Sequence, residues 1–247
     1  MSESIKILIN GVAGAGKTSL LTTLGKETFV VSRDAKKFGL GIPHMLVENY
    51  QDMDTLIYGE EGIITTIDKY EEKFGKYPEN VVIDSVSQIT MDVIDKASQT
   101  PNVYGSQGAE ITKEMATFVK FIHEDLELNG INVILLNHVI PEKDEGKETG
   151  AYSQFGQGKF LAKGGFYAAT NEAITIVPSG NHRAVYLRGT KKQARTTLSD
   201  MPDKMPVENY VNPSKSPKLK EGEKYFNLKS HIETLVASQK KVTDWVL

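Results

Sequence analysis

The sequence predicts an α/β fold, with a mainly parallel, twisted sheet flanked by helices and an antiparallel hairpin toward the C-terminus. Short apolar runs typical of buried strands alternate with segments whose apolar residues recur at helical spacing. Such alternation indicates βαβ units, in which helices connect parallel strands. Residues 172–179 and 182–189 are two further strand-like segments, and the Gly-Asn dipeptide between them favours a tight turn.

The expected elements follow in a regular order along the chain. Strands are predicted at 5–10, 28–32, 45–50, 81–85 and 133–138, and helices at 17–25, 60–74, 86–99, 111–126 and 226–241. Residues 141–165 are polar and glycine-rich, and we expect a long irregular segment there that is either functional or disordered. We expect one core domain over 1–199. Residues 200–247 should form an extended linker and a C-terminal helix that packs on or extends this core.

Composition narrows the class of protein. The chain has 247 residues, no cysteine and a net charge of −3, so disulfides and thiolate metal sites are excluded and DNA coating by bulk charge is disfavoured. The five histidines show no metal-ligand spacing. No apolar run approaches the roughly 20 residues of a membrane-spanning helix, so we expect a cytoplasmic protein with no membrane partner.

A glycine-rich loop supplies the most specific signal. Residues 11–18 match G-x-x-x-x-G-K-[ST] between a predicted strand and a predicted helix, the context of a phosphate-binding P-loop. Ser19 stands where a G-x-G-x-x-G dinucleotide fingerprint requires its third glycine, so that fingerprint is not matched. A glycine-rich turn without ligand is the alternative. The predicted nucleotide-binding residues are Gly11, Val12, Ala13, Gly14, Ala15, Gly16, Lys17, Thr18 and Ser19.

A second strand ends in an acid. In VVIDS, residues 81–85, Asp84 follows three apolar residues, where a carboxylate can hold the water shell of a Mg²⁺ ion that Thr18 also binds. The alternative is that Asp84 caps the next helix. Many P-loop ATPases place a catalytic glutamate after this acid, but Ser85 stands there. Asp34, after the second strand, is the candidate base, with a cap or turn role equally open.

Three further groups could serve such a site. Asn137 or His138, at the end of an apolar strand, could sense the γ-phosphate, or could form a satisfied polar pair. The cations Arg188, Lys191 and Lys192 could act on the nucleotide of a neighbouring subunit, or could form a solvated face. Aromatic residues and lysines that could bind single-stranded nucleic acid occur together at Tyr152, Phe155, Lys159, Phe160, Lys163 and Phe166.

This order of parts resembles the RecA-like core ATPases, and more closely the phage-encoded Sak-four group of single-strand annealing proteins. NVYGSQGAEITKEM at 102–115 resembles the segment that, in that group, comes after the helix following the acid-bearing strand. RGTKKQARTTLSDMP and FNLKSHIETL resemble its C-terminal end.

The resemblance implies roles for single residues. Lys17, Thr18 and Asp84 would bind ATP and Mg²⁺, Asp34 would replace the catalytic glutamate, and His138 would replace the glutamine that senses the γ-phosphate. Residues 139–166 would form a DNA-binding loop, and Lys191 and Lys192 would lie near cations that act across a subunit interface. Asp34 is one methylene shorter than the family's glutamate, and His138 replaces its glutamine. Both differences imply slow ATP hydrolysis, stimulated by DNA.

The expected function is therefore a Mg²⁺-dependent ATPase acting on single-stranded DNA in annealing or strand exchange. Its expected partners are further copies in a ring or filament and a single-strand binding protein, in the host cytoplasm. A nucleotide or small-molecule kinase is an alternative, although only Arg33 lies between the P-loop helix and Asn137 to hold a second phosphate. A P-loop regulator with a protein partner is the other alternative.

Overall fold

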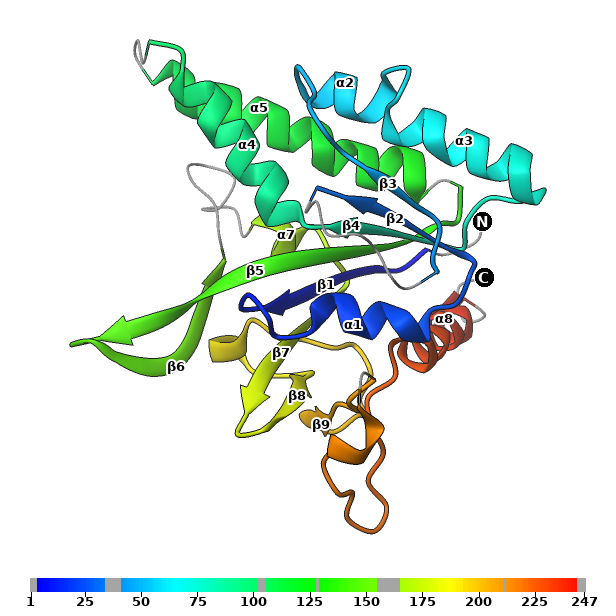
Figure 1. Ribbon diagram of the computed structural model, residues 1–247, viewed down its shortest axis with the longest axis vertical. Helices are drawn as coiled ribbons and strands as arrows, with labels where there is room; N and C mark the ends of the chain where they lie inside the picture. Colours follow the sequence, from blue (N-terminus) through cyan, green and yellow to red (C-terminus); the bar gives the residue numbers. More distant parts are fainter. Residues whose placement is uncertain are drawn as a thin grey trace.

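The computed structural model describes residues 4–33, 41–101, 105–127, 129–154, 165–210 and 212–243. Its described strands form one sheet in the order β3-β2-β4-β5-β1-β7-β8-β9, with β6 paired to β5 (Figure 1). The strands are β1 (Lys6–Gly11), β2 (Thr28–Ser32), β3 (His44–Leu46), β4 (Asn80–Asp84), β5 (Asn132–Asp144), β6 (Lys147–Gln154), β7 (Glu172–Ser179), β8 (His182–Tyr186) and β9 (Lys204–Pro206).

The predicted fold class is confirmed. Strands β1, β2, β3, β4, β5 and β7 pair in parallel, whereas β7–β8 and β8–β9 pair antiparallel. The helical segments are α1 (Lys17–Leu20), η1 (Leu21–Thr23), α2 (Met53–Tyr58), α3 (Ile63–Phe74), α4 (Val86–Ser98), α5 (Ser106–Phe121), η2 (Ile122–Leu126), α7 (Gly165–Ala168), η3 (Thr190–Lys192), η4 (Pro213–Lys215) and α8 (Leu228–Thr243).

Two apolar layers hold the sheet between helices. Helices α2, α3, α4 and α5 cover one face, while α1 and α8 lie on the other (Figure 1). Successive strand residues point to opposite faces, so Val81 and Ile83 belong to the first layer and Val82 to the second. Burial on both faces explains why these strands are continuous apolar runs in the sequence.

The segment after His138 differs from the expectation. We expected a long irregular stretch over 141–165, but β5 continues to Asp144 and the chain returns as β6, forming an arm that projects from the body (Figure 1). Glu145 and Gly146 have φ values of 46° and 80°, the left-handed pair of a two-residue hairpin turn. The polar strands gave no burial signal, because residues 142–149 are exposed.

The C-terminal segment packs on the core. Residues 204–206, expected within a linker, form β9 and pair with β8. In α8, Leu228, Ile232 and Leu235 are buried in the same apolar layer as the strands. The domain boundary at 199/200 remains a prediction. Within the described ranges, no helix has the length and apolar character needed to cross a lipid bilayer.

Candidate nucleotide site

The glycine-rich loop has the backbone of a phosphate cradle. It leaves β1 at Gly11 and enters α1 at Lys17. Gly14 and Gly16 have φ values of 74° and 95°, in the left-handed region that glycine adopts without steric strain. These turns bring successive backbone N–H groups to the start of α1, the arrangement that binds phosphate oxygens. The loop therefore fits the phosphates of a nucleotide.

Lys17 is buried and held over the loop. Its Nζ donates to the carbonyl oxygens of Gly11 at 2.7 Å and Val12 at 3.2 Å. The same Nζ lies 3.3 Å from Nδ1 of His138, at the end of the buried part of β5. Parallel pairing of β1 with β5 sets Gly11 opposite His138 and so explains this contact. The side chains predicted as phosphate ligand and phosphate sensor thus meet.

Thr18 and Asp84 converge in the same way. The Thr18 Oγ1 donates to Oδ2 of Asp84 at 3.0 Å, and the carboxylate is nearly buried at the end of β4. Mg²⁺ in nucleotide sites is bound by one or two protein oxygens together with phosphate oxygens and water. The neighbouring hydroxyl of Thr18 and carboxylate of Asp84 are oxygens of this kind. In the described part of the chain no three acidic or histidine side chains cluster for a metal. The hydroxyl of Thr18 and the carboxylate of Asp84 fit a Mg²⁺ ion held jointly with a nucleotide.

The cap of α4 is supplied by Ser85, immediately after Asp84. Its side chain accepts a hydrogen bond from the backbone N–H of Gln88 at 3.3 Å. This is the N-cap arrangement, which satisfies a donor left open at the helix start. The alternative in which Asp84 itself caps the helix is thus not needed, and the Asp84 carboxylate is directed to Thr18 instead.

Two asparagines lie beneath the loop. Nδ2 of Asn137 donates to Oδ1 of Asn10 at 2.9 Å, and both side chains are fully buried. Nδ2 of Asn10 in turn donates to the carbonyl of Gln193 at 3.1 Å, just after η3. The backbone N–H of His138 donates to Oγ of Ser87 on α4 at 3.0 Å. Sequence reasoning left Asn137 open as a sensor, and this pairing favours a polar pair that positions His138.

Comparison with known proteins places this site in a family. A family model described as an AAA domain matches residues 3–163, more than half of the chain, and includes the loop, Asp84 and His138. The chain belongs to this AAA domain family. No curated protein sequence matches the chain. Among solved structures, the crystal structure of the RadB recombinase is similar at a TM-score of 0.46 and 12% identity, covering 83% of this chain and 87% of that chain.

The predicted DNA-binding residues fall at the end of the AAA domain match. Phe155, Lys159, Phe160 and Lys163 lie outside the described residues, as does the candidate base Asp34. Tyr152 is buried in β6, with Lys192 Nζ 4.8 Å from its ring centroid, and burial raises the pKa of its hydroxyl. Phe166 is a core residue that contacts Phe118 edge-on, so its ring is not a surface for stacking bases.

The predicted trans-acting cations lie C-terminal to the AAA domain match and have partners within the chain. Arg188 donates to the carbonyl oxygens of Leu198, Ser199 and Met201 and pairs with Asp203 at 3.2 Å. Lys192 Nζ donates to the Gly150 carbonyl of the arm at 2.5 Å. Lys191 is exposed. Action of Arg188 or Lys192 on a neighbouring subunit remains a prediction and requires these contacts to break.

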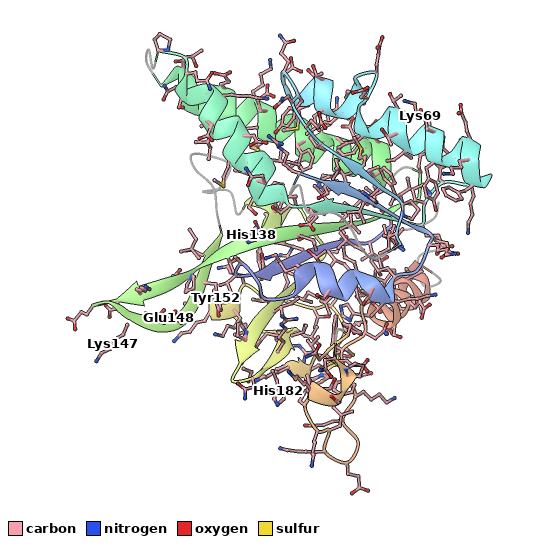
Figure 2. All side chains as sticks on the ribbon, in the orientation of Figure 1. Lys69, His138, Lys147, Glu148, Tyr152 and His182 are labelled. Carbon is pink, nitrogen blue, oxygen red and sulfur yellow. The ribbon has the colours of Figure 1, made fainter. Side chains whose placement is uncertain are left out.

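Arg183 lies at the candidate nucleotide site but was not predicted from the sequence. Arg183, on β8, lies against the P-loop of the AAA domain, and its Nη2 is 3.4 Å from the Gly14 carbonyl. A Cβ built on Gly16 would lie 2.5 Å from Nη1 of Arg183. The sequence places Arg183 among other cations, but only the pairing of β7 beside β1 brings it to the loop. Figure 2 shows neighbouring His182 low in the view and His138 at the root of the arm.

Proposed function

We propose that the chain is a Mg²⁺-dependent, RecA-like ATPase. The observation that carries the proposal is the convergence of Lys17 with His138 and of Thr18 with Asp84 beside the adjacent strands β4, β5 and β1. The loop amides and Lys17 would hold the β- and γ-phosphates of ATP. Thr18 and Asp84 would hold Mg²⁺, which when bound neutralises charge on the transferred phosphoryl group. His138, whose Nδ1 lies 3.3 Å from Nζ of Lys17, would contact the γ-phosphate.

The hydrolytic role needs a group that orients water. The residue after Asp84 is Ser85, whose side chain caps α4, and it offers no carboxylate for this role. We propose Asp34, which follows β2, as this group. Strand β2 pairs with β4 so that Ser32 lies opposite Asp84, and the backbone N–H of Arg33 donates to the Asp84 carbonyl at 2.7 Å. This pairing supports a place for Asp34 near the phosphates, at the carboxyl ends of the strands.

The substrate we propose is single-stranded DNA, handled in annealing or strand exchange during phage recombination or replication. Residues 155–164 carry Phe155, Lys159, Phe160 and Lys163, the aromatic and cationic types that stack bases and neutralise phosphates. They follow the arm that starts at His138, which supports coupling between ATP and DNA. A ring or filament would bring Lys191 to a neighbouring nucleotide. A single-strand binding protein is a proposed further partner.

The experiment is ATP turnover with and without a single-stranded oligonucleotide. We expect DNA to raise the turnover of the wild type, Lys17→Ala to abolish nucleotide binding, and Thr18→Val to lose turnover that Thr18→Ser retains. Lys69→Ala, on the exposed face of α3, is the matched control and should behave as wild type. If DNA changes neither ATP affinity nor turnover, the DNA role is wrong, even if Lys17 proves essential.

One observation favours a second candidate, a regulator that binds a protein. The exposed end of the arm, residues 142–148, carries four carboxylates and two lysines, a balance that repels DNA phosphates and suits a basic protein surface. Figure 2 labels Lys147 and Glu148 at this end. Replacing Glu145 and Glu148 by glutamine should strengthen DNA binding if the arm lies along DNA. The same change should weaken capture of a protein partner if the arm binds one.

A further inference from the structure

Ser87 is a buried serine in the first turn of α4, the helix that follows the acid-bearing strand β4. The buried side of this helix is otherwise largely apolar and includes Val86, Ile89 and Val93. A hydroxyl in such surroundings is costly unless it is hydrogen-bonded. Oγ of Ser87 accepts a hydrogen bond from the backbone N–H of His138 at 3.0 Å. The hydroxyl thus ties the start of α4 to a distant strand.

This bond lies where β5 has passed the end of β4. The parallel pairing of the two strands stops at Asp84 opposite Leu136, because the chain then turns into α4. His138 lies two residues further along β5, and toward β1 it is still in register with Gly11. Beyond the end of β4, a buried backbone N–H on that side of β5 needs another acceptor. The Ser87 hydroxyl supplies it.

Ser87 therefore joins two strands that the P-loop contacts separately. Lys17 Nζ lies 3.3 Å from Nδ1 of His138 on β5. Thr18 Oγ1 donates to Oδ2 of Asp84 on β4 at 3.0 Å. The Ser87 bond connects the backbone of β5 to the helix that follows Asp84, at the level of these two contacts. The side chains of the candidate site are thus linked behind the loop as well as through it.

We infer that Ser87 is a positioning residue for His138. The inference rests on the proposed function, in which the His138 side chain contacts the γ-phosphate. By fixing the backbone from which the imidazole extends, the hydroxyl keeps the imidazole in a constant position relative to Asp84. Misplacement of a group by about 1 Å is enough to weaken its action on a substrate strongly. The alternative is that Ser87 only satisfies a buried N–H and adds stability.

Ser87→Ala should weaken binding of a nucleoside triphosphate and spare that of the diphosphate. The P-loop and Lys17, which hold the β-phosphate that both nucleotides carry, stay in place. The variant removes the acceptor of the His138 N–H, so the backbone shifts or takes up water and the imidazole moves with it. Calorimetry with Mg²⁺ gives the affinities for ADP and for ATPγS, a slowly hydrolysed ATP analogue. We expect the ATPγS/ADP affinity ratio to fall about fivefold, as for loss of one hydrogen bond.

Two variants control for the hydroxyl and for burial. Ser87→Thr keeps the acceptor and should keep the wild-type affinity ratio. Thr90→Val removes a buried hydroxyl from the same helix with little change of shape, and that hydroxyl donates to the Val86 carbonyl of the helix itself at 2.8 Å. It should leave the ratio unchanged, whatever its effect on stability. The melting temperature of each variant shows whether it is folded.

A double-mutant cycle tests whether Ser87 acts through His138. In His138→Ala the imidazole is absent, so adding Ser87→Ala should lower the ATPγS/ADP ratio no further. A residue that acts through Asp84, or by loosening the whole site, would lower the ratio by the same factor in both backgrounds. Amide exchange without nucleotide gives an independent measurement. The His138 amide should exchange about fivefold faster in Ser87→Ala and at the wild-type rate in Thr90→Val.

The outcomes separate this inference from the proposed function. A wild-type ratio in Ser87→Ala, while His138→Ala lowers it, overturns the positioning role and leaves the γ-phosphate contact intact. An equal loss in both backgrounds, or an unchanged exchange rate of the His138 amide, also overturns it. A wild-type ratio in His138→Ala overturns the proposed γ-phosphate contact and the positioning role with it. A loss that Ser87→Thr restores and that His138→Ala makes undetectable supports both.

Discussion

Asn137 and Asn10, in register on adjacent parallel strands, share a fully buried hydrogen bond of 2.9 Å directly beneath the phosphate-binding loop. Asn10 extends the link to the carbonyl of Gln193, and Thr175 Oγ1 donates to the carbonyl of Lys192. The loop, the strand that carries His138 and the η3 turn that contacts the arm are therefore joined through one set of buried polar groups. Such networks are sensitive to removal of a member.

Asn137→Leu should destabilise the protein. It leaves Oδ1 of Asn10 buried without its donor, which costs about 1–3 kcal/mol. Urea unfolding measures the change. Asn129→Ala, at an exposed position, should shift stability by less than about 0.5 kcal/mol. An Asn137→Leu protein as stable as the Asn129→Ala control would show that the buried pair contributes nothing.

Gly16→Ala should lower stability by about 1–2 kcal/mol, because alanine is strained at a φ of 95°. Its Cβ would also meet Arg183, so the double variant with Arg183→Ala should recover only the contact part of the loss. Gly108→Ala in α5 is the matched control: a Cβ there meets no described atom within 4 Å. It should stabilise by about 0.5–1 kcal/mol. The melting temperatures of Gly16→Ala, of its double variant with Arg183→Ala and of Gly108→Ala measure these changes. Equal melting temperatures of Gly16→Ala and Gly108→Ala would contradict the loop geometry.

Lys192→Ala should loosen the arm. Nζ of Lys192 contacts the Gly150 carbonyl and lies near the rings of Tyr152 and Tyr186, at 4.8 and 5.5 Å from their centroids. Without it, amide exchange along β6 should quicken about tenfold, for a local loss of about 1.4 kcal/mol. Lys191→Ala, its exposed neighbour, should leave exchange unchanged. Identical exchange in both variants would mean that Lys192 does not hold the arm.

Stability should fall between pH 7 and pH 5 because of His231. Burial lowers the pKa of its imidazole from 6.5 to about 4, and neither ring nitrogen has a hydrogen-bond partner among the described residues. The unfolded chain therefore takes up a proton as pH falls through 6.5, while the folded protein resists it until about pH 4. From this group we expect a loss of about 2 kcal/mol at pH 5.

The control for this pH effect replaces the imidazole. The group that faces His231 is Glu172, whose Oε2 lies 3.9 Å from Nε2 on the neighbouring strand β7. His231→Leu keeps Glu172 and removes the proton uptake, so urea unfolding at pH 7 and pH 5 should differ less than in the wild type. His182→Ala, an exposed histidine, should retain the wild-type pH dependence. A His231→Leu protein with an undiminished pH dependence would rule His231 out as its source.

Local sequence patterns were sufficient to predict the glycine-rich loop and the strand that ends in Asp84. The P-loop needs glycines at positions with positive φ, and buried parallel strands are apolar throughout, so both leave a mark in the sequence. Asp84 was singled out because it ends such a strand, and β4 does end there. The pairing of Asn10 with Asn137 was missed because it depends on the register of β1 against β5, which no local pattern encodes.

Other elements lacked a usable signal. The arm is exposed along its outer part, so its strands show no alternation of apolar and polar residues. Helix α2 was not predicted, because only six residues, Met53–Tyr58, form it, too few for a helical period to stand out. Arg183 reaches the P-loop through the pairing of β7 with β1, which joins residues far apart in the chain.

Strand β5 joins the core beside the phosphate-binding loop to the arm. It runs as one strand from the buried core, past the histidine that contacts Lys17, to the turn of the arm, and its pairing changes from parallel with β1 and β4 to antiparallel with β6. The six residues from Val139 to Asp144 extend about 20 Å at about 3.3 Å per residue. A small tilt of β5 at its root is therefore magnified at the outer end. The irregular pairing between Pro141 and Lys143 is the place where bending would absorb that motion. We therefore expect the stiffness of this short stretch to set how far a tilt of β5 at its root moves the end of the arm.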